Sequence, residues 1–141
     1  MSKAPWVLDT NVVLDLFHFD DPVARPLRLA FDAGALPCAA SPATLAEWRR
    51  VLGYPEFGLD VAAQARLYAG YADRVLPRPD GASMRLPRCR DADDQKFLQL
   101  AACCGSVLVS KDRALLTLAR RVTGFAIVSP GEAVRRLSRQ A

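Results

Sequence analysis

Short apolar runs alternate with longer amphipathic segments along the chain. The runs are WVLD at residues 6–9, LPCAAS at 36–41, SVLVS at 106–110 and GFAIVS at 124–129. Each is four to six residues long, which is typical of strands buried on both faces of a sheet. The pattern therefore predicts a mostly parallel sheet.

Segments with helical spacing separate and follow these runs. We expect helices over residues 10–17, 22–34, 41–55, 60–76, 92–104, 113–121 and 130–140, and an exposed loop over the proline-rich residues 77–90. Because strands alternate with helices, the expected fold class is α/β, with helices covering both faces of the sheet. A length of 141 residues suits one domain, residues 1–141.

The composition is that of a globular domain and gives no sign of a membrane protein. The chain is 51% hydrophobic and 24% charged, as expected for a globular domain. It has neither an apolar run of the roughly 20 residues that a membrane span needs nor a signal-peptide core near its start. We therefore expect a cytoplasmic protein with no membrane partner.

The cysteine and histidine content excludes several chemistries. Four cysteines (Cys38, Cys89, Cys103 and Cys104) form no CxxC pair, and the single histidine, His18, lies far from them in sequence. A zinc site and nucleophilic catalysis by serine or cysteine with histidine are both disfavoured. Any chemistry is expected to depend on carboxylates.

The net charge of +4, with a pI near 9.1, leans towards polyanionic partners. Arginines cluster at Arg49–Arg50, at Arg85, Arg88 and Arg90, at Arg120–Arg121 and at Arg135, Arg136 and Arg139. Two interpretations stay open, since each cluster could be a solvated helix face or could contact a nucleic-acid backbone.

Acidic residues fall at comparable places. Asp9 ends the first strand, Asp112 follows the strand SVLVS, Glu47 lies early in the helix after the second strand, and Asp91, Asp93 and Asp94 open another helix. In an open α/β sheet these places face the crevice at the carboxyl ends of the strands, where ligands bind. Each acid could instead serve locally: Asp9 and Asp112 as helix caps, Asp91 with Asp94 as a capping box, and Glu47 as a surface residue.

Helical spacing separates Asp94 from its neighbours. Phe97 and Ala101 lie three and seven residues further on, so Asp94 should share their buried face. Asp91 lies about one turn earlier on that face, whereas Asp93 points elsewhere. Because converging carboxylates repel each other, a hard divalent cation such as Mg²⁺ is the expected compensation.

The ordered set of motifs resembles the PIN-domain ribonucleases, particularly the branch of toxin components of toxin–antitoxin pairs. VLDTNVVLDL is similar to the family's opening strand, SPATLAEWRRVLGYPEF to its glutamate-bearing helix, RDADDQKFLQLA to its central acidic helix, LVSKDRALLTL to its last acidic turn and FAIVSPGEAV to its closing strand and helix. The likeness extends over nearly the whole chain. It implies a PIN-like three-layer α/β/α sandwich with a central, mostly parallel sheet of about five strands.

The resemblance also implies a site and an activity. Asp9, Glu47, Asp94 and Asp112 would be catalytic and bind Mg²⁺ or Mn²⁺ together with Asp91, supported by Thr10, Asn11 and Ser110. The implied enzyme is a metal-dependent endoribonuclease that hydrolyses RNA phosphodiester bonds. RNA, a cognate antitoxin protein and a second copy of the chain are its candidate partners. Lys111 departs from many relatives and would contact a phosphate or point to solvent.

Two alternatives of other kinds remain. A Mg²⁺-dependent phosphoryl-transfer domain also places acids at strand ends, but the expected Asp after the second strand and the Asp-x-Asp motif after the first are both missing. A catalytically silent RNA-binding or regulatory module would use the acids only as caps. It predicts that Asp94→Asn leaves RNA binding and stability almost unchanged.

Overall fold

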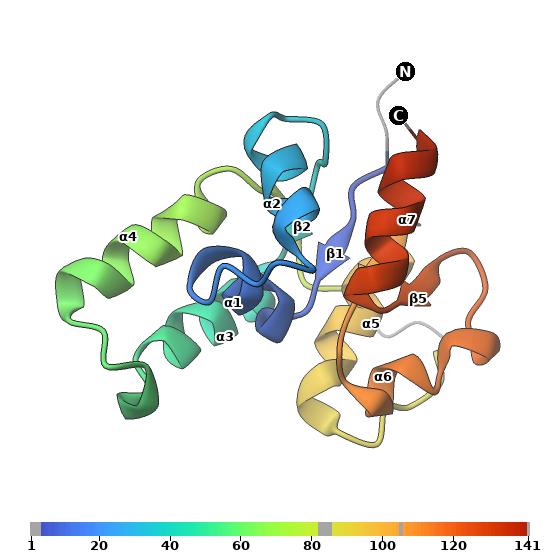
Figure 1. Cartoon of the computed structure of the whole chain (residues 1–141). Helices are drawn as coiled ribbons and strands as arrows, with labels where there is room; N and C mark the ends of the chain where they lie inside the picture. Colours follow the sequence, from blue (N-terminus) through green and yellow to red (C-terminus); the bar gives the residue numbers. More distant parts are fainter. Residues whose placement is uncertain (1–3, 82–85, 105, 141) are drawn as a thin grey trace.

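The computed structural model describes residues 4–81, 86–104 and 106–140 (Figure 1). Its strands in these ranges are β1 (Val7–Leu8), β2 (Ala39–Ala40), β3 (Leu76–Pro77), β4 (Val107–Val109) and β5 (Ala126–Val128). Every pairing between them is parallel. The mostly parallel sheet predicted from the sequence is therefore confirmed.

The strands form a three-stranded and a two-stranded sheet that meet beside β1. In the first, β4 lies between β1 and β5, with Leu108 opposite both Val7 and Ile127. β2 pairs with β3, and a parallel bridge joins Trp6 to Cys38. The five strands thus follow the spatial order β3-β2-β1-β4-β5, so the carboxyl ends of β1 and β4 are adjacent.

The helices lie between the strands in sequence, as expected. The α-helices are α1 (Thr10–Phe17), α2 (Arg25–Asp32), α3 (Pro42–Leu52), α4 (Val61–Ala72), α5 (Gln95–Cys104), α6 (Arg113–Leu116) and α7 (Pro130–Gln140). Three short 3₁₀ helices are η1 (Pro55–Phe57), η2 (Ala92–Asp94) and η3 (Ala119–Arg121). The helix expected over 113–121 is divided into α6 and η3.

Alternate strand residues face two separate hydrophobic cores, which establishes the three layers. Leu8, Val109 and Val128 pack with residues of α1, α2, α3 and α7. Val7, Leu108 and Ile127 point the other way and pack with residues of α5 and α6. This alternation is the period of two that a strand covered on both faces requires.

Local sequence explains how α3 begins and ends. Ser41 and Thr44 form a reciprocal capping box, since the Ser41 hydroxyl accepts from the Thr44 amide at 3.3 Å and the Thr44 hydroxyl accepts from the Ser41 amide at 2.9 Å. Pro42 occupies the first turn and Gly53 follows the last helical residue. Because Ser41 directly follows β2, Glu47 lies in the second turn beyond the carboxyl end of that strand.

The region after α4 differs from expectation. The helix expected over 60–76 ends at Ala72, and Leu76–Pro77 form the edge strand β3, with the Leu76 amide donating to the Cys38 carbonyl at 2.8 Å. Sequence pattern missed this strand because its two residues are too few to show a period. Proline, which has no amide hydrogen, is tolerated there because the strand lies at an edge. In the loop expected over 77–90, residues 82–85 lie outside the described residues, and Cys89 is buried rather than exposed.

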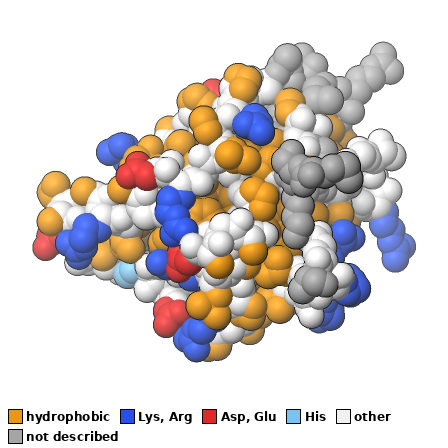
Figure 2. Space-filling model, turned by 90° about the horizontal axis from the view of Figure 1, so that it is seen from above, with side chains coloured by type: hydrophobic (Ala, Val, Ile, Leu, Met, Phe, Trp, Pro, Cys, Tyr) orange, Lys and Arg blue, Asp and Glu red, His pale blue; other side chains and the backbone are white. Residues whose placement is uncertain are grey.

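The surface agrees with the mixed composition. On the face shown in Figure 2, hydrophobic, basic and acidic side chains are interspersed. No helix in the described part of the chain is long and apolar enough to cross a membrane.

Candidate metal centre

Five acidic side chains gather where β1 and β4 end. Asp9 directly follows β1 and Asp112 begins α6 just after β4, whereas Asp91 and Asp94 come from the η2 turn and Glu47 comes from α3. Because β1 and β4 are neighbours and run parallel, the residues after them emerge at the same edge of the sheet. The fold thus brings together acids that are far apart in sequence.

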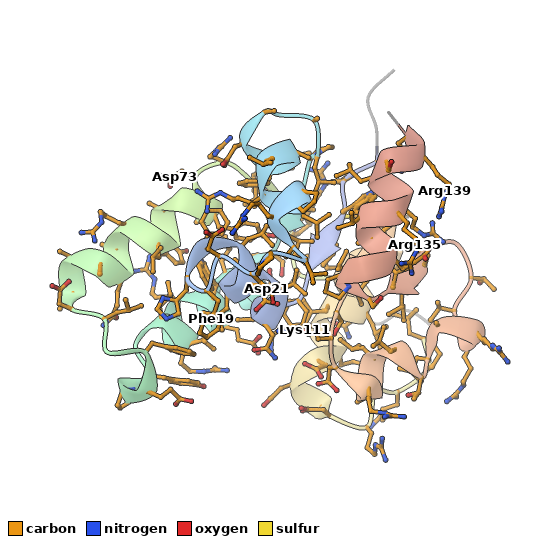
Figure 3. All side chains as sticks on the ribbon, viewed as in Figure 1. Phe19, Asp21, Asp73, Lys111, Arg135 and Arg139 are labelled. Atoms are coloured by element: carbon orange, nitrogen blue, oxygen red, sulfur yellow. The ribbon has the colours of Figure 1, made fainter. Side chains whose placement is uncertain are left out.

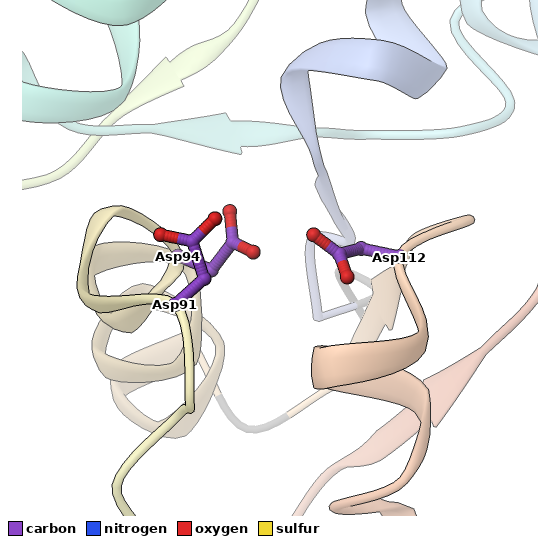
Figure 4. Close-up of side chains that lie close together, drawn as sticks. All are labelled: Asp91, Asp94 and Asp112. Atoms are coloured by element: carbon purple, nitrogen blue, oxygen red, sulfur yellow. The ribbon is translucent and has the colours of Figure 1, made fainter.

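The tightest group consists of Asp91, Asp94 and Asp112. One carboxylate oxygen from each lies within 4.8 Å of the others. Figure 4 shows Asp91 and Asp94 facing Asp112 across the space between η2 and α6. Asp94 is buried, Asp112 is half-buried and Asp91 is exposed, so the group opens to solvent on one side. Oxygen ligands on one open side are what Mg²⁺ or Mn²⁺, which retain water ligands, require.

Asp94 carries the clearest sign that a cation fits this group. Its Oδ2 atom is buried and accepts no hydrogen bond from any described residue, and the side chain that faces it is another carboxylate, Asp112. Burial, a proton shared with Asp112 and the negative charges of Asp9, Asp112 and Asp91 raise the pKa of Asp94 to about 8. The site therefore holds either a proton or a cation at neutral pH.

Asp9 is joined to the group through Ser110. The Ser110 hydroxyl donates to Asp9 Oδ2 at 2.7 Å and accepts from the Asp112 amide at 2.9 Å. Burial raises the pKa of Asp9, the Ser110 hydrogen bond opposes that rise, and the charges of Glu47 and Asp112 add to it. Asp9 begins α1, but its side chain makes no capping hydrogen bond, so the interpretation of Asp9 as a cap is wrong.

Glu47 lies near enough to Asp9 for their charges to interact, and it is buried rather than a surface residue. The Thr10 hydroxyl donates to Glu47 Oε2, and the Lys96 ammonium lies 2.8 Å from Glu47 Oε1. The Arg50 guanidinium is 3.7 Å from the same oxygen. Glu47 therefore already has cationic partners, whereas Asp94 has none among the described residues.

Capping and ligand binding are compatible at two of the acids. Asp91 Oδ1 accepts from the Asp93 amide at 3.0 Å, and Asp112 Oδ1 accepts from the Ala114 amide at 2.8 Å. Each caps with one oxygen, and its second oxygen remains for another partner. The capping box expected for Asp91 with Asp94 does not form, because the Asp91 side chain accepts from the Asp93 amide and the Asp94 amide donates to the Asp91 carbonyl oxygen instead.

The supporting residues expected from the sequence divide into two kinds. Thr10 and Ser110 are buried and donate hydrogen bonds to Glu47 and Asp9. Asn11 lies in the first turn of α1 with its side chain exposed to solvent, and no acid contact is found for it among the described residues. Contacts therefore support roles for Thr10 and Ser110.

Sequence reasoning missed Asp15 and misplaced Lys111. Asp15 is buried within α1, and the Lys111 ammonium lies 2.7 Å from its Oδ2 atom. Lys111 is labelled in Figure 3. Lys111 therefore neutralises a buried acid rather than pointing only to solvent, and its contact with a phosphate stays a prediction. An acid inside the apolar segment VVLDLF was the available signal for Asp15.

The arginine clusters expected from the sequence have different surroundings. Arg135, Arg136 and Arg139 surround Glu132 on α7, as expected for a solvated helix face. Arg88 and Arg90 line a hollow beside Asp91 that also contains Gln95, whereas Arg85 lies outside the described residues. Arg50 lies at the acidic centre, 3.7 Å from Glu47 Oε1, whereas Arg88 and Arg90 are exposed next to Asp91 in sequence.

Ser110→Ala should destabilise the metal-free protein by about 1–3 kcal/mol, because it leaves the buried Asp9 carboxylate without its donor. Urea unfolding in EDTA at pH 7 measures the change, with Ser138→Ala, an exposed serine on α7, as the matched control. Equal effects of the two substitutions would show that the Ser110 hydrogen bonds do not stabilise the site.

Comparisons with known proteins agree with this geometry. The family described as PIN domain matches residues 5–114. None of the curated proteins matches the chain significantly. Among solved structures, PAE2754 from Pyrobaculum aerophilum superposes with a TM-score of 0.67 at 19% identity, covering 97% of this chain and 91% of that one. At this identity the likeness to PAE2754 is one of fold.

Proposed function

This chain belongs to the PIN-domain family, and on that premise we propose that it is a divalent-metal-dependent endoribonuclease. PIN domains are generally nucleases and typically use a divalent metal. The observation that carries the proposal is the buried Asp94 Oδ2 atom, which accepts no hydrogen bond and faces other carboxylates. An arrangement of this kind is costly unless a cation completes it.

In this proposal Asp91, Asp94 and Asp112 hold Mg²⁺ or Mn²⁺, with Asp9 and Glu47 completing the acidic centre. A cation held by these residues would supply Lewis acidity at a phosphate oxygen and would lower the pKa of its bound water. Ser110 orients Asp9 and Asp112 through its two hydrogen bonds, and Thr10 with Lys96 orients Glu47. Arg50, Arg88 and Arg90 bind the RNA backbone, which confers affinity with little sequence preference.

The test is cleavage of labelled single-stranded RNA by purified protein in EDTA, Mg²⁺ and Mn²⁺ in parallel. We expect cutting only with the divalent cations. Binding of RNA without cutting under every condition would overturn the nuclease and favour the silent RNA-binding module.

The proposal extends to biological role. On the resemblance of its motifs, the chain is a single domain over residues 1–141 and the toxin of a toxin–antitoxin pair, with an antitoxin protein and a second copy as partners. Induced expression in a bacterial host tests the role, since the wild type should arrest growth and Asp94→Asn should not. Equal growth of the two strains, at equal protein levels, would contradict the toxin role.

A further inference from the structure

An exposed row of aromatic rings begins beside the acidic centre. Tyr54 and Phe57 lie nearly parallel, with centroids 6.4 Å apart and 8° between their planes. Phe57 contacts the His18 ring at 5.3 Å and the Phe19 ring at 5.9 Å. We call these four residues the aromatic row, which joins η1 to the residues that follow α1 (Figure 3 labels Phe19).

Folding does not account for all of these rings. Phe57 is half-buried and packs on the hydrophobic core, which anchors the row. Phe19 is 56% exposed and Tyr54 is 38% exposed, so much of their ring surface faces solvent. A contiguous set of exposed apolar side chains usually marks an interaction surface.

Arg50 connects the row to the acids. It lies one helical turn after Glu47 on α3, with its guanidinium 3.7 Å from Glu47 Oε1. The Tyr54 side chain lies close enough to the same guanidinium to interact with its charge. The exposed guanidinium of Arg50 therefore lies between the acidic centre and the Tyr54 ring. The backbone of a strand that runs from that centre towards the ring would pass this guanidinium.

A basic side chain followed by exposed aromatic rings is a combination by which proteins hold a single-stranded nucleic acid. Basic side chains follow the phosphates, while exposed rings stack on unpaired bases with little regard to sequence. A duplex keeps its base faces stacked internally and cannot offer them to such a surface. The continuity of the row with the acidic centre, through Arg50, favours RNA over a protein as the occupant.

We propose that the aromatic row is a stacking platform for unpaired bases next to the phosphate at the acidic centre, with Arg50 binding the phosphate between them. This inference rests on the proposed ribonuclease function and assigns to these particular residues the contact with the unpaired bases on this side of the centre. Tyr54 and Phe19 are positioning residues that hold the strand and leave the chemistry to the acids.

The test measures RNA binding without cleavage, in EDTA, by fluorescence anisotropy. A single strand carrying normal bases is compared with the same strand made abasic and with its duplex. Phe19→Leu and Tyr54→Leu keep apolar bulk and remove the ring. Tyr54→Phe keeps the ring, and Leu29→Ala removes an exposed apolar side chain from α2, outside the aromatic row.

Each leucine variant should bind the normal strand about fivefold to a hundredfold more weakly, the loss typical of one stacked base. Both variants should bind the abasic strand as the wild type does, and the Tyr54→Phe and Leu29→Ala variants should bind the normal strand almost unchanged. Equal losses on normal and abasic strands, or no losses, would overturn the platform, provided that circular dichroism shows native folds. A change in self-association without a change in RNA binding would assign the row to a protein interface and also overturn it.

Cleavage assays with Mg²⁺ separate this inference from the proposed function. Leucine variants of an active nuclease should show a raised KM with kcat nearly unchanged. Wild-type cutting with unchanged KM in the variants would reject the platform and leave the nuclease intact. Base-dependent binding without any cutting would reject the nuclease and retain the platform.

Discussion

An Asp94→Asn variant is expected to lose at least about a hundredfold of the metal-dependent cleavage rate, because even an outer-shell partner of a metal ligand typically contributes tenfold to a hundredfold. The same substitution should leave the metal-free protein as stable as the wild type, or more stable. The Asp94 carboxylate faces Asp112 and has no donor for Oδ2, whereas a neutral amide can donate to Asp112.

Cleavage rates and thermal unfolding in EDTA and in Mg²⁺ measure both effects. Mg²⁺ should raise the wild-type Tm, because a ligand that binds only the folded state stabilises it, and should raise the variant's Tm less. Asp93→Asn is the matched control, since Asp93 is the adjacent acid in η2 and is exposed. Similar losses of cleavage in the two variants would argue against Asp94 as the ligand, and full activity in Asp94→Asn would shift the role to Asp91.

Binding of Mg²⁺ should depend steeply on pH, because the cation must displace a proton. The pKa of Asp94 is raised from 3.8 to about 8 by burial, by its shared proton with Asp112 and by nearby negative charge. Below pH 8 the Asp94–Asp112 pair therefore holds a proton, and apparent Mg²⁺ affinity should rise up to about tenfold per pH unit. Above pH 8 the affinity should become constant.

The raised pKa of Asp94 also makes the metal-free protein less stable as pH rises. Between about pH 4 and pH 8 the folded state binds more protons at Asp94 than the unfolded chain does, so the free energy of unfolding falls across this window. This direction is the reverse of that for a carboxylate with a lowered pKa. The stabilisation from the raised pKa is complete below about pH 4 and is lost by pH 8, because in that window the unfolded chain has released the proton while the folded state still holds it.

Calorimetric titration with Mg²⁺ from pH 6 to pH 9, in buffers of different ionisation enthalpy, measures affinity and proton release together. The wild type should release close to one proton per bound cation at pH 7, and Asp94→Asn should release much less. An affinity that does not change between pH 6 and pH 8 would contradict a proton-holding Asp94.

Several features of the fold and site follow from sequence because their causes are local. Four of the strands are apolar runs, and the capping box of Ser41 with Thr44 fixes where α3 begins. The spacing of Asp94 to Phe97 and Ala101 predicted that Asp94 is buried and that Asp93 points away from that face, and the structure has Asp94 buried and Asp93 exposed. The spacing of apolar residues in a helix or strand repeats within a few residues, so it can be recognised in the sequence without knowledge of the tertiary structure.

Other features depend on which elements become neighbours. The two-residue strand β3 exists only because the edge of β2 offers it hydrogen bonds. Lys96 meets Glu47 across α5 and α3, and Lys111 meets Asp15 across the β4–α6 connection and α1. Sequence therefore determined the elements and the acids at their ends. Tertiary packing decided which acids acquired a cationic partner and left Asp94 without one, because ion pairing depends on distances between segments that the chain brings together only on folding.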